Sequence, residues 1–467
     1  MAGGNWTTEN AFDRPGAYFN FKAVPQPLSN IGSRGVVTMP LPLDWGPQGE
    51  LIEVLSTDLQ DGNSIPKLGY SGMTEGIQAI REALRGCYKA YIFRVDTGGA
   101  KATATLGALT ATAKYYGICG NNISVEVVES DKESGSEDEP YYDVITYYNT
   151  LEQERQTVKK IKELVSNDFV EFSGSELQLQ EVVMTPLTSG TNGTIVKDTY
   201  ATYLNVMKRK KWQVLGLPGV TDTAIITQVV DYIRALRKNN GKKVTAVVYN
   251  YHVADDEAIT SINQGYFTQS EQIQPQVFVA TVAGLSAGAE MNESLTYHVI
   301  EGAIGIIGEL DDDEIKAALV NGKMVLSTRS DGAIVIEKDI NTLHTFTIGK
   351  DYQFSKNRVI RTLDNIANDL QLTWEVSYIG KVDNDDQGRK DYKADVIYYL
   401  TELERLRAIQ NFDSTTDIDV LPGKEADAVI LNLHVQPVDS MEKLYGTIMV
   451  GKKSSSYTFV TQEVAGQ

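Results

Sequence analysis

Apolar segments of strand length alternate with amphipathic helical segments in the middle of this chain, and this alternation restricts the fold more than any other feature. Three such apolar segments are residues 212–216, 244–249 and 276–282. A helical segment follows Asp222, whose carboxylate can cap it, and its apolar face consists of Ile225, Val229, Ile233 and Leu236. Strands that are apolar on both faces and joined by helices form parallel sheets with right-handed crossovers. The sequence therefore predicts an α/β core.

The N-terminal part of the chain has the same character. Residues 36–41, 50–54 and 88–95 are predicted strands. Between the last two, apolar residues at helical spacing predict a helix: Met73, Ile77, Ile80 and Leu84. After the core, residues 324–327 and 333–337 flank the dipeptide Asp331-Gly332, which is typical of a hairpin turn.

The block from 97 to 185 differs in composition from the segments around it. Short alternating runs predict strands at residues 123–128, 141–148 and 177–184, with one helix near residues 157–166. Its acidic loop, residues 129–140, is better explained as a solvated turn than as a cation site. We therefore expect an inserted all-β domain.

The C-terminal third predicts an α+β domain. Its first helix has one apolar face, formed by Val359, Leu363, Ile366 and Leu370. Three basic residues near its start are expected to point away from that face: Lys356, Arg358 and Arg361. Strands are predicted around residues 372–379 and 428–435, with a helix near residues 397–410 between them.

Both ends of the chain predict extended β arms instead of packed elements. At the N-terminus, side chains alternate along a short aromatic run, Tyr18, Phe19, Asn20 and Phe21. At the C-terminus, the corresponding run is Tyr457, Thr458, Phe459 and Val460. Neither segment is long enough to bury itself, so each is either a disordered tail or a strand that completes another sheet.

The chain of 467 residues is long enough for about three domains. We divide it into an N-terminal arm, a discontinuous α/β domain with an insertion, a C-terminal domain and a C-terminal arm. The predicted boundaries are 1–27, 28–96, 97–185, 186–348, 349–444 and 445–467.

Composition excludes several classes of protein. The net charge of −19 repels phosphate, so nucleic-acid binding is not expected. Cys87 and Cys119 are too few for a disulfide framework and suit a reducing compartment, and the four histidines lack metal-ligand spacing. No apolar run is long enough to cross a bilayer, and no signal peptide is apparent, so membrane insertion is not expected.

Residues 284–288 match the G-x-S-x-G pattern of a serine nucleophile after a predicted strand. The pattern is short and no oxyanion loop accompanies it, so we interpret Ser286 as part of a structural strand-to-helix turn. Residues 383–388 resemble the start of a calcium loop, but Ala394 occupies the position that needs a bidentate Glu, which favours a hairpin turn. The acidic run 311–314 suits a helix N-terminus. Basic runs at 208–211, 237–238 and 242–243 suit solvated helix ends, or a charged protein–protein contact.

The sequence offers no convincing active, cofactor or metal site, and it has predicted arms at both ends. Together these two features suggest self-assembly. If each subunit both donates and accepts arms, the contact is heterologous and generates rings or helices.

The chain resembles the contractile tail sheath proteins of myovirus-type bacteriophages and phage-tail-like particles. The resemblance rests on a set of short motifs whose order and spacing are specific when taken together. These motifs are residues 14–18 (RPGAY), 34–37 (RGVV), 44–47 (DWGP), 187–193 (LTSGTNG), 282–284 (VAG), 335–343 (VIEKDINTL) and 356–361 (KNRVIR). The resemblance covers most of the chain and is weakest between about residues 97 and 185.

The resemblance implies hexameric rings stacked around an inner tail tube, with termini woven into the C-terminal domains of neighbours. It also implies baseplate and tail terminator partners, assembly in the bacterial cytoplasm, and contraction by rigid-body repacking of domains. It assigns no catalytic residue. Some of Lys356, Arg358 and Arg361 are expected to meet the tube, unless they form a solvated face or pair within the sheath.

Two other hypotheses come from different classes of protein. One is an α/β-hydrolase-like enzyme that uses Ser286 with His298, His344 or His434. The other is a non-contractile binding or shell protein that shares only the arms. Tubes or stacked rings in a purified sample would favour the sheath, and a monomer with esterase turnover would favour the enzyme.

Overall fold

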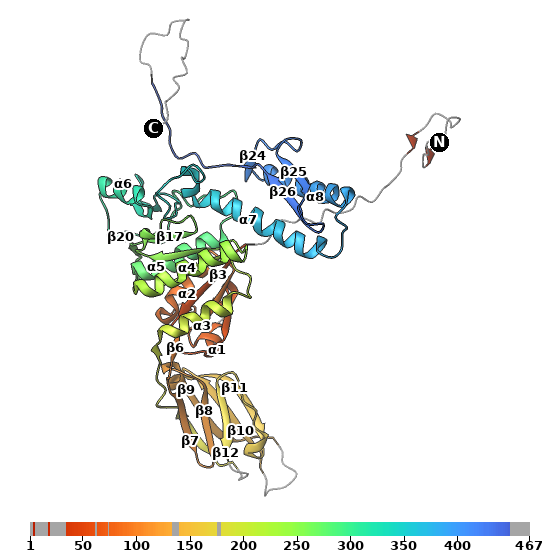
Figure 1. The fold of residues 1–467 in the computed structure, drawn as a ribbon. Coiled ribbons are helices and arrows are strands. Elements are labelled where there is room, and N and C mark those ends of the chain that lie inside the picture. The colour runs from red at the N-terminus through yellow and green to blue at the C-terminus, as the bar shows by residue number, and fades with distance from the viewer. Residues whose placement is uncertain are drawn as a thin grey trace.

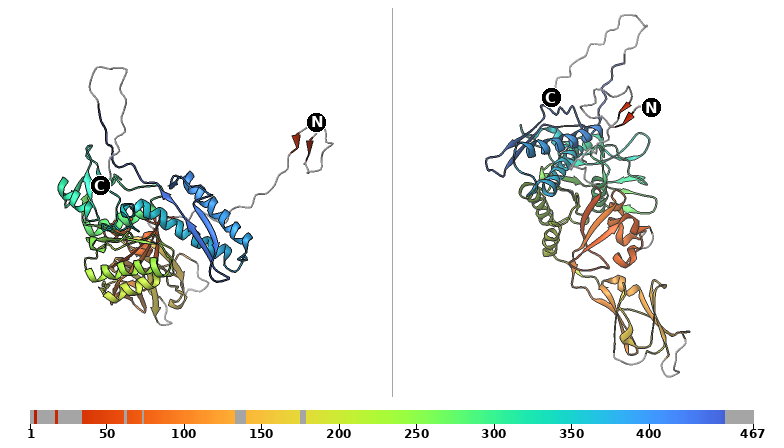
Figure 2. Two further views of the ribbon diagram at one scale, coloured as in Figure 1. Left: turned by 45° about the horizontal axis from the view of Figure 1, so that its top comes forward. Right: turned by 90° about the vertical axis from the view of Figure 1, so that its right-hand side faces the viewer.

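The computed structural model describes residues 3–4, 17–18, 34–60, 63–72, 74–132, 140–174 and 179–448. The folded body is elongated, with a β-sandwich at one end, an α/β domain in the middle and a C-terminal domain at the other end (Figures 1 and 2). This arrangement confirms the prediction of a multidomain α/β protein with an inserted all-β domain.

A seven-stranded sheet forms the central domain. Its strands, in spatial order, are β21 (Lys323–Met324), β17 (Ile259–Ile262), β16 (Thr245–Tyr249), β15 (Val214–Gly216), β3 (Val36–Leu41), β5 (Lys89–Arg94) and β4 (Leu51–Leu55). Neighbouring strands are parallel except β4, which runs antiparallel to β5. The mainly parallel sheet predicted from the continuous apolar runs is therefore confirmed.

Helices cover both faces of this sheet, because its strands are apolar on both sides. One face packs against α2 (Gln78–Leu84) and the other against α3 (Lys197–Met207) and α4 (Thr223–Asn239). The predicted cap of α4 is confirmed, since the Asp222 carboxylate accepts a hydrogen bond of 2.9 Å from the Ala224 N–H. The predicted apolar face of α4 is buried in the core.

The prediction of a strand at residues 276–282 is wrong, because this segment belongs to helix α5 (Pro275–Gly288). Its Val and Thr residues have high strand propensity, but α5 lies buried against α2, where packing decides the conformation. Pro275 at the first helical turn was the signal for a helix start, since its ring fixes a helical φ and it lacks an N–H.

Shorter elements complete the central domain. They are α1 (Ser64–Leu68), α6 (Asp312–Val320), the pair β6 (Asp96–Thr97) and β14 (Thr194–Ile195), the sheet of β19 (Gln272–Ile273), β18 (Gly265–Phe267) and β20 (Gly305–Ile307), and the hairpin of β22 (Leu326–Thr328) and β23 (Ile334–Ile336). The hairpin predicted around Asp331-Gly332 is confirmed. The acidic run also does what was predicted: Asp311 caps α6 in a capping box with Glu314.

The inserted domain consists of two antiparallel sheets. One contains β11 (Leu151–Val158), β10 (Tyr142–Tyr148), β9 (Ile123–Glu129) and β13 (Val182–Pro186), and the other β12 (Val170–Gly174), β8 (Leu109–Tyr116) and β7 (Lys101–Leu106). The helix predicted near residues 157–166 is wrong, because β11 ends at Val158 and only a short 3-10 turn, Ile161–Glu163, follows. The middle of the acidic loop lies outside the described residues.

The C-terminal domain is built on two long helices, α7 (Asn357–Thr373) and α8 (Asp386–Arg405). Two antiparallel strand pairs accompany them: β25 (Ile418–Pro422) with β26 (Val429–Leu433), and β24 (Ile409–Gln410) with β27 (Gln436–Pro437). The second strand predicted here, at residues 428–435, corresponds to β26.

Two predictions for this domain are wrong. Residues 372–379 do not form a strand, because α7 continues to Thr373 and a π-helix, Trp374–Tyr378, follows it. Residues 383–388 do not form a hairpin turn: the Asp385 carboxylate accepts the Gly388 N–H at 2.7 Å and caps α8, which starts eleven residues earlier than position 397.

The first two strands are β1 (Gly3–Gly4) and β2 (Ala17–Tyr18), which pair in parallel with each other. In Figure 1 they lie apart from the folded body.

Candidate inter-subunit site

The hairpin of β25 and β26 has one buried and one open face. Its buried face packs on the core of the C-terminal domain next to α8 and consists of Ile418, Val420, Leu431 and Leu433. On the open face, Leu421 and Ile430 lie opposite each other and are exposed. In the part of the chain that the structure describes, each of the two strands has a single partner. A two-stranded sheet is only marginally stable, so both outer edges are available for another strand.

The register shows which N–H groups face the open edges. Backbone bonds from His434 N to Asp417 O (2.8 Å) and from Gly423 N to Ala428 O (2.8 Å) bracket the hairpin. Because hydrogen-bonded and non-hydrogen-bonded pairs alternate in an antiparallel ladder, Val420 and its partner Leu431 form a non-hydrogen-bonded pair. Their N–H groups therefore point away from the hairpin, towards the edges.

The predicted arm residues are not brought to this hairpin by the structure. Tyr18 lies in β2, of which only the backbone is described. Phe19, Asn20, Phe21, Tyr457, Thr458, Phe459 and Val460 lie outside the described residues. Their role stays a prediction. Of the hairpin, β26 was predicted but β25 was missed, although Val420 and Leu431 lie in alternating segments on either side of Gly423, which is the usual signal.

The basic residues at the start of α7 do not form the solvated face that was one of the alternatives, because all three are buried. Lys356, Arg358 and Arg361 are 3%, 9% and 5% exposed. Arg361 donates to the Glu293 carbonyl at 2.7 Å and lies 3.5 Å from the Asp339 carboxylate. Both faces of α7 are covered, because it lies between the core of the C-terminal domain and the central domain. Contact of these side chains with an inner tube stays an untested prediction, and their burial weighs against it.

Charged and polar groups fill the joint between α7 and the central sheet. Arg237 of α4 binds Asp364 of α7 through two hydrogen bonds of 2.5 and 2.8 Å. Burial raises the pKa of Asp364, although the Arg237 guanidinium acts in the opposite direction. Arg34, just before β3, donates to the Asn365 side chain at 2.7 Å. Burial, and then repulsion from Arg361, lower the pKa of Arg34 to about 9.

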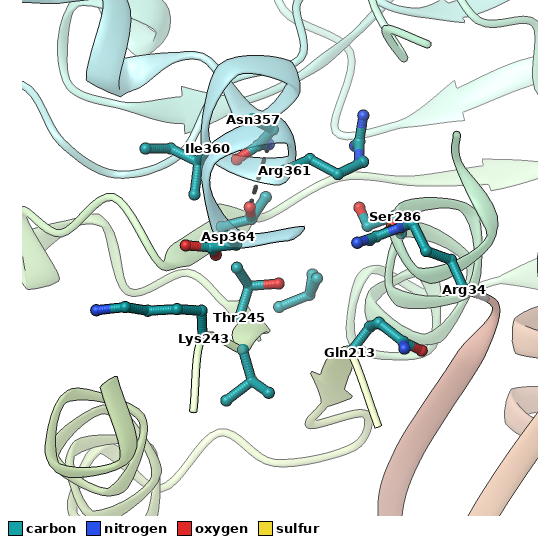
Figure 3. A pocket seen from close by; sticks show the side chains of 12 residues that line it. Arg34, Gln213, Lys243, Thr245, Ser286, Asn357, Ile360, Arg361 and Asp364 are labelled. Carbon is teal, nitrogen blue, oxygen red and sulfur yellow. Dashed lines mark hydrogen bonds between the residues drawn. The ribbon is translucent and has the colours of Figure 1, made fainter. Parts of the chain in front are cut away.

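Ser286 lies beside this joint, on helix α5 (Figure 3). The prediction of a strand-to-helix turn is wrong, because Ser286 lies inside the helix, where no strained elbow exposes its hydroxyl. The neighbouring cavity of about 30 Å³ has room for roughly one water molecule. The described residues that line it include no histidine. Of the hypothesised partners, His344 contacts Thr342 and Asp255, and His434 contacts Asp417.

The two glycines of the same motif lie where α5 packs closely against the segment of α2. A Cβ atom at Gly284 would collide with the carbonyl oxygen of Ala83, and one at Gly288 with that of Gly86. Spaced four residues apart, both glycines lie on the face of α5 that contacts α2. The motif therefore serves close helix packing.

Other ligand sites find no support in the described part of the chain. Within it, no group of three or more His, Cys, Asp or Glu residues is arranged to hold a metal ion. None of the helices there is long and apolar enough to cross a membrane. Cys87 and Cys119 are both buried, free thiols.

Comparison with known proteins identifies the class to which this architecture belongs. Four family models match consecutive parts of the chain. They are the tail sheath protein Gp18 domain III N-terminal region (residues 34–95), the phage tail sheath protein beta-sandwich domain (97–192), the phage tail sheath protein central domain (193–342) and the phage tail sheath C-terminal domain (349–451).

Relatives agree over nearly the whole length. The phage-like element PBSX protein XkdK of Bacillus subtilis is 31% identical over 96% of this chain and 100% of its own length. The crystal structure of the sheath tail protein of Desulfitobacterium hafniense is 36% identical, covers 92% of this chain and 99% of that chain, and has a TM-score of 0.80. The sheath tail protein of Listeria innocua is 33% identical over 90% of this chain and 96% of that chain, with a TM-score of 0.78.

The chain therefore belongs to the phage tail sheath protein family. It is a structural protein and not an enzyme, and it is a component of a phage tail or phage-like particle. The helical sheath of the anti-feeding prophage in its contracted state shares the fold at 12% identity, with a TM-score of 0.55 over 93% of this chain and 98% of that chain.

Proposed function

We propose that this sheath subunit polymerises as hexameric rings stacked around an inner tail tube and contracts to drive the tube through a bacterial envelope. The observation that carries the proposal is the two-stranded hairpin β25/β26, whose edges are free in the described chain, together with β-prone segments at both ends. Each subunit would donate arms to its neighbours and accept theirs. Such a contact is heterologous, and it generates rings or a helix.

Strand addition gives each arm enough free energy to link subunits. A backbone hydrogen bond contributes about 1 kcal/mol net. Burying one Phe side chain adds roughly 1.5–3 kcal/mol, and each predicted arm strand carries two aromatic residues on one face. Part of this total offsets the entropy of ordering the arm, so several kcal/mol per arm remain at most. The gain repeats at every subunit.

Contraction would be a rigid-body repacking of subunits while the woven arms keep them connected. Solved structures that share the fold support this, since two of them are sheaths in the contracted state and one is a baseplate. By the same analogy, the partners of this subunit would be the tube, baseplate and tail terminator proteins, with assembly in the bacterial cytoplasm.

Truncation of the arms tests the proposal. We expect subunits lacking residues 1–24, or residues 452–467, to be folded and soluble but unable to polymerise. Circular dichroism would report the fold, and sedimentation and negative-stain microscopy would report assembly. Tubes of normal length from both truncated proteins would contradict the woven-arm proposal. A control truncation of residues 1–2 should assemble like the full chain.

A further inference from the structure

A buried ion pair holds the segment that leads into the C-terminal arm. Directly after β27, the Val438 N–H donates a backbone hydrogen bond of 3.0 Å to the Ala408 carbonyl of the C-terminal domain. From residue 441 to residue 448, every residue is exposed except Glu442. The exposed side chains include four large apolar ones: Met441, Leu444, Tyr445 and Ile448.

The Glu442 carboxylate enters a site made by other parts of the chain. Its side chain is 13% exposed, and it forms an ion pair and hydrogen bond with the ammonium group of Lys356, which is 4% exposed. The Thr296 hydroxyl donates to the other carboxylate oxygen at 2.9 Å. Lys338 approaches to 4.0 Å and also donates to the Tyr352 hydroxyl at 2.5 Å.

This arrangement has the character of a specific latch. Burial raises the pKa of Glu442, but the hydrogen bond and charge of Lys356 outweigh burial and hold that pKa below its ordinary value. Two ammonium groups, on Lys356 and Lys338, converge on Glu442, and Asp439 of the same segment lies 3.5 Å from Lys356. Without these partners a largely desolvated carboxylate would be left unpaired, which is unfavourable, so the contact favours the segment in this position.

The latch also changes where the arm begins. Without it, the arm would leave from β27 in the C-terminal domain. With it, the segment crosses to the central domain, because Glu442 contacts Thr296 and Lys338, which belong to that domain. Figure 1 shows this dark blue segment running from β24 towards the teal part of the chain near α6.

We propose that Lys356 and Glu442 are positioning residues that fix the exit point of the C-terminal arm on the central domain, so that the arm reaches a second copy of this chain at a defined position. The proposal rests on the proposed function, because the partner is another subunit of the sheath. It assigns to Lys356 a role within the subunit, in place of the expected tube contact.

Spin-label distance measurements on the isolated subunit test the latch independently of assembly. Labels would be attached at Leu444→Cys and Val320→Cys, both on exposed residues, while the native cysteines are buried. With the latch intact we expect one narrow distance distribution. In Glu442→Gln, which keeps the shape but removes the charge, the released tether of residues 439–444 would spread the distances by about 13 Å.

Lys443→Gln is the matched control, since it removes an exposed charge from the next residue and should keep the narrow distribution. Lys356→Met should broaden it as Glu442→Gln does. Unchanged distances in Glu442→Gln would overturn the latch. Helical order of the assembled polymer is the second readout: we expect Glu442→Gln to lose it, and broad distances with unchanged helical order would overturn the positioning role. Failure of the unmodified chain to polymerise would instead contradict the proposed function and leave the distance test intact.

Discussion

The central domain and the C-terminal domain build their sheets in opposite ways. The central sheet has seven strands, apolar residues on both faces and a layer of helices on each side. The sheets of the described C-terminal domain are only strand pairs, and its joint to the central domain includes the ion pair of Arg237 with Asp364 and other polar groups. The first region covers both faces of its sheet within one subunit. The second supplies orientation and open edges, which is what a polymer of identical subunits needs.

The largest effect is expected where the two regions meet. Arg237→Met leaves the buried carboxylate of Asp364 without its bidentate partner and should lower the free energy of unfolding by about 3–5 kcal/mol. Lys238→Met, one residue away and exposed, is the control. Urea denaturation would measure both.

The pH dependence of the Arg237→Met variant gives a second check. The pKa of Asp364 is already raised in the folded protein, and loss of Arg237 raises it further. A carboxyl whose folded pKa exceeds its unfolded value favours folding in its protonated form. The deficit of the variant should therefore shrink as the pH falls through this pKa, and a deficit that is constant between neutral and acidic pH would contradict the assignment.

The next effect concerns the close packing of the central domain. Gly288→Val would drive a side chain into the Gly86 carbonyl between α5 and α2, which should cost about 1–3 kcal/mol. Gly349→Ala, at a position with open space around the new Cβ, should change the unfolding free energy little. Equal thermal denaturation curves for the two variants would show that the helices are not held at this contact.

A substitution in the C-terminal domain should change stability less but should affect assembly. Val420→Pro removes an N–H that faces the open edge of β25, so it should cost the isolated subunit only about 1 kcal/mol, yet it should block strand addition. Val420→Thr keeps the N–H and a similar shape and should still assemble. Sedimentation would report assembly, and normal polymers from the proline variant would remove β25 as an acceptor edge.

The smallest effect is expected for Ser286→Ala, which keeps a small side chain at a packed helical position. We expect a stability change within about 0.5 kcal/mol and intact assembly. Labelling of the unmodified protein by a serine-directed probe, lost in this variant, would contradict the structural role.

Sequence patterns predicted the regions where local signals and packing agree. The Asp222 cap, the apolar face of α4 and the parallel strands all follow from spacing that a single segment contains. Helix α5 was misread because its Val and Thr residues favour strands, and burial against α2 decided otherwise. The sequence had a signal for α5 in Pro275, which was overlooked, and a signal for α8 in Asp385, which was assigned to a hairpin turn.

The candidate sites depend on contacts between distant segments, which a single sequence does not contain. The partner of Lys356, Glu442, lies 86 residues away, so the pattern around the start of α7 could not reveal this ion pair. Arg237 and Asp364 are 127 residues apart. Periodicity predicts which face of α7 is apolar, but not that a second domain covers the other face.

The central claim is that β25/β26 is an incomplete sheet that neighbouring subunits complete. A helical reconstruction by cryo-electron microscopy of the polymer assembled from the full chain tests it most directly. The account predicts additional strands along the free edges of β25 and β26, traceable to the termini of adjacent subunits. A polymer in which the hairpin remains two-stranded, with both edges exposed to solvent, would contradict it.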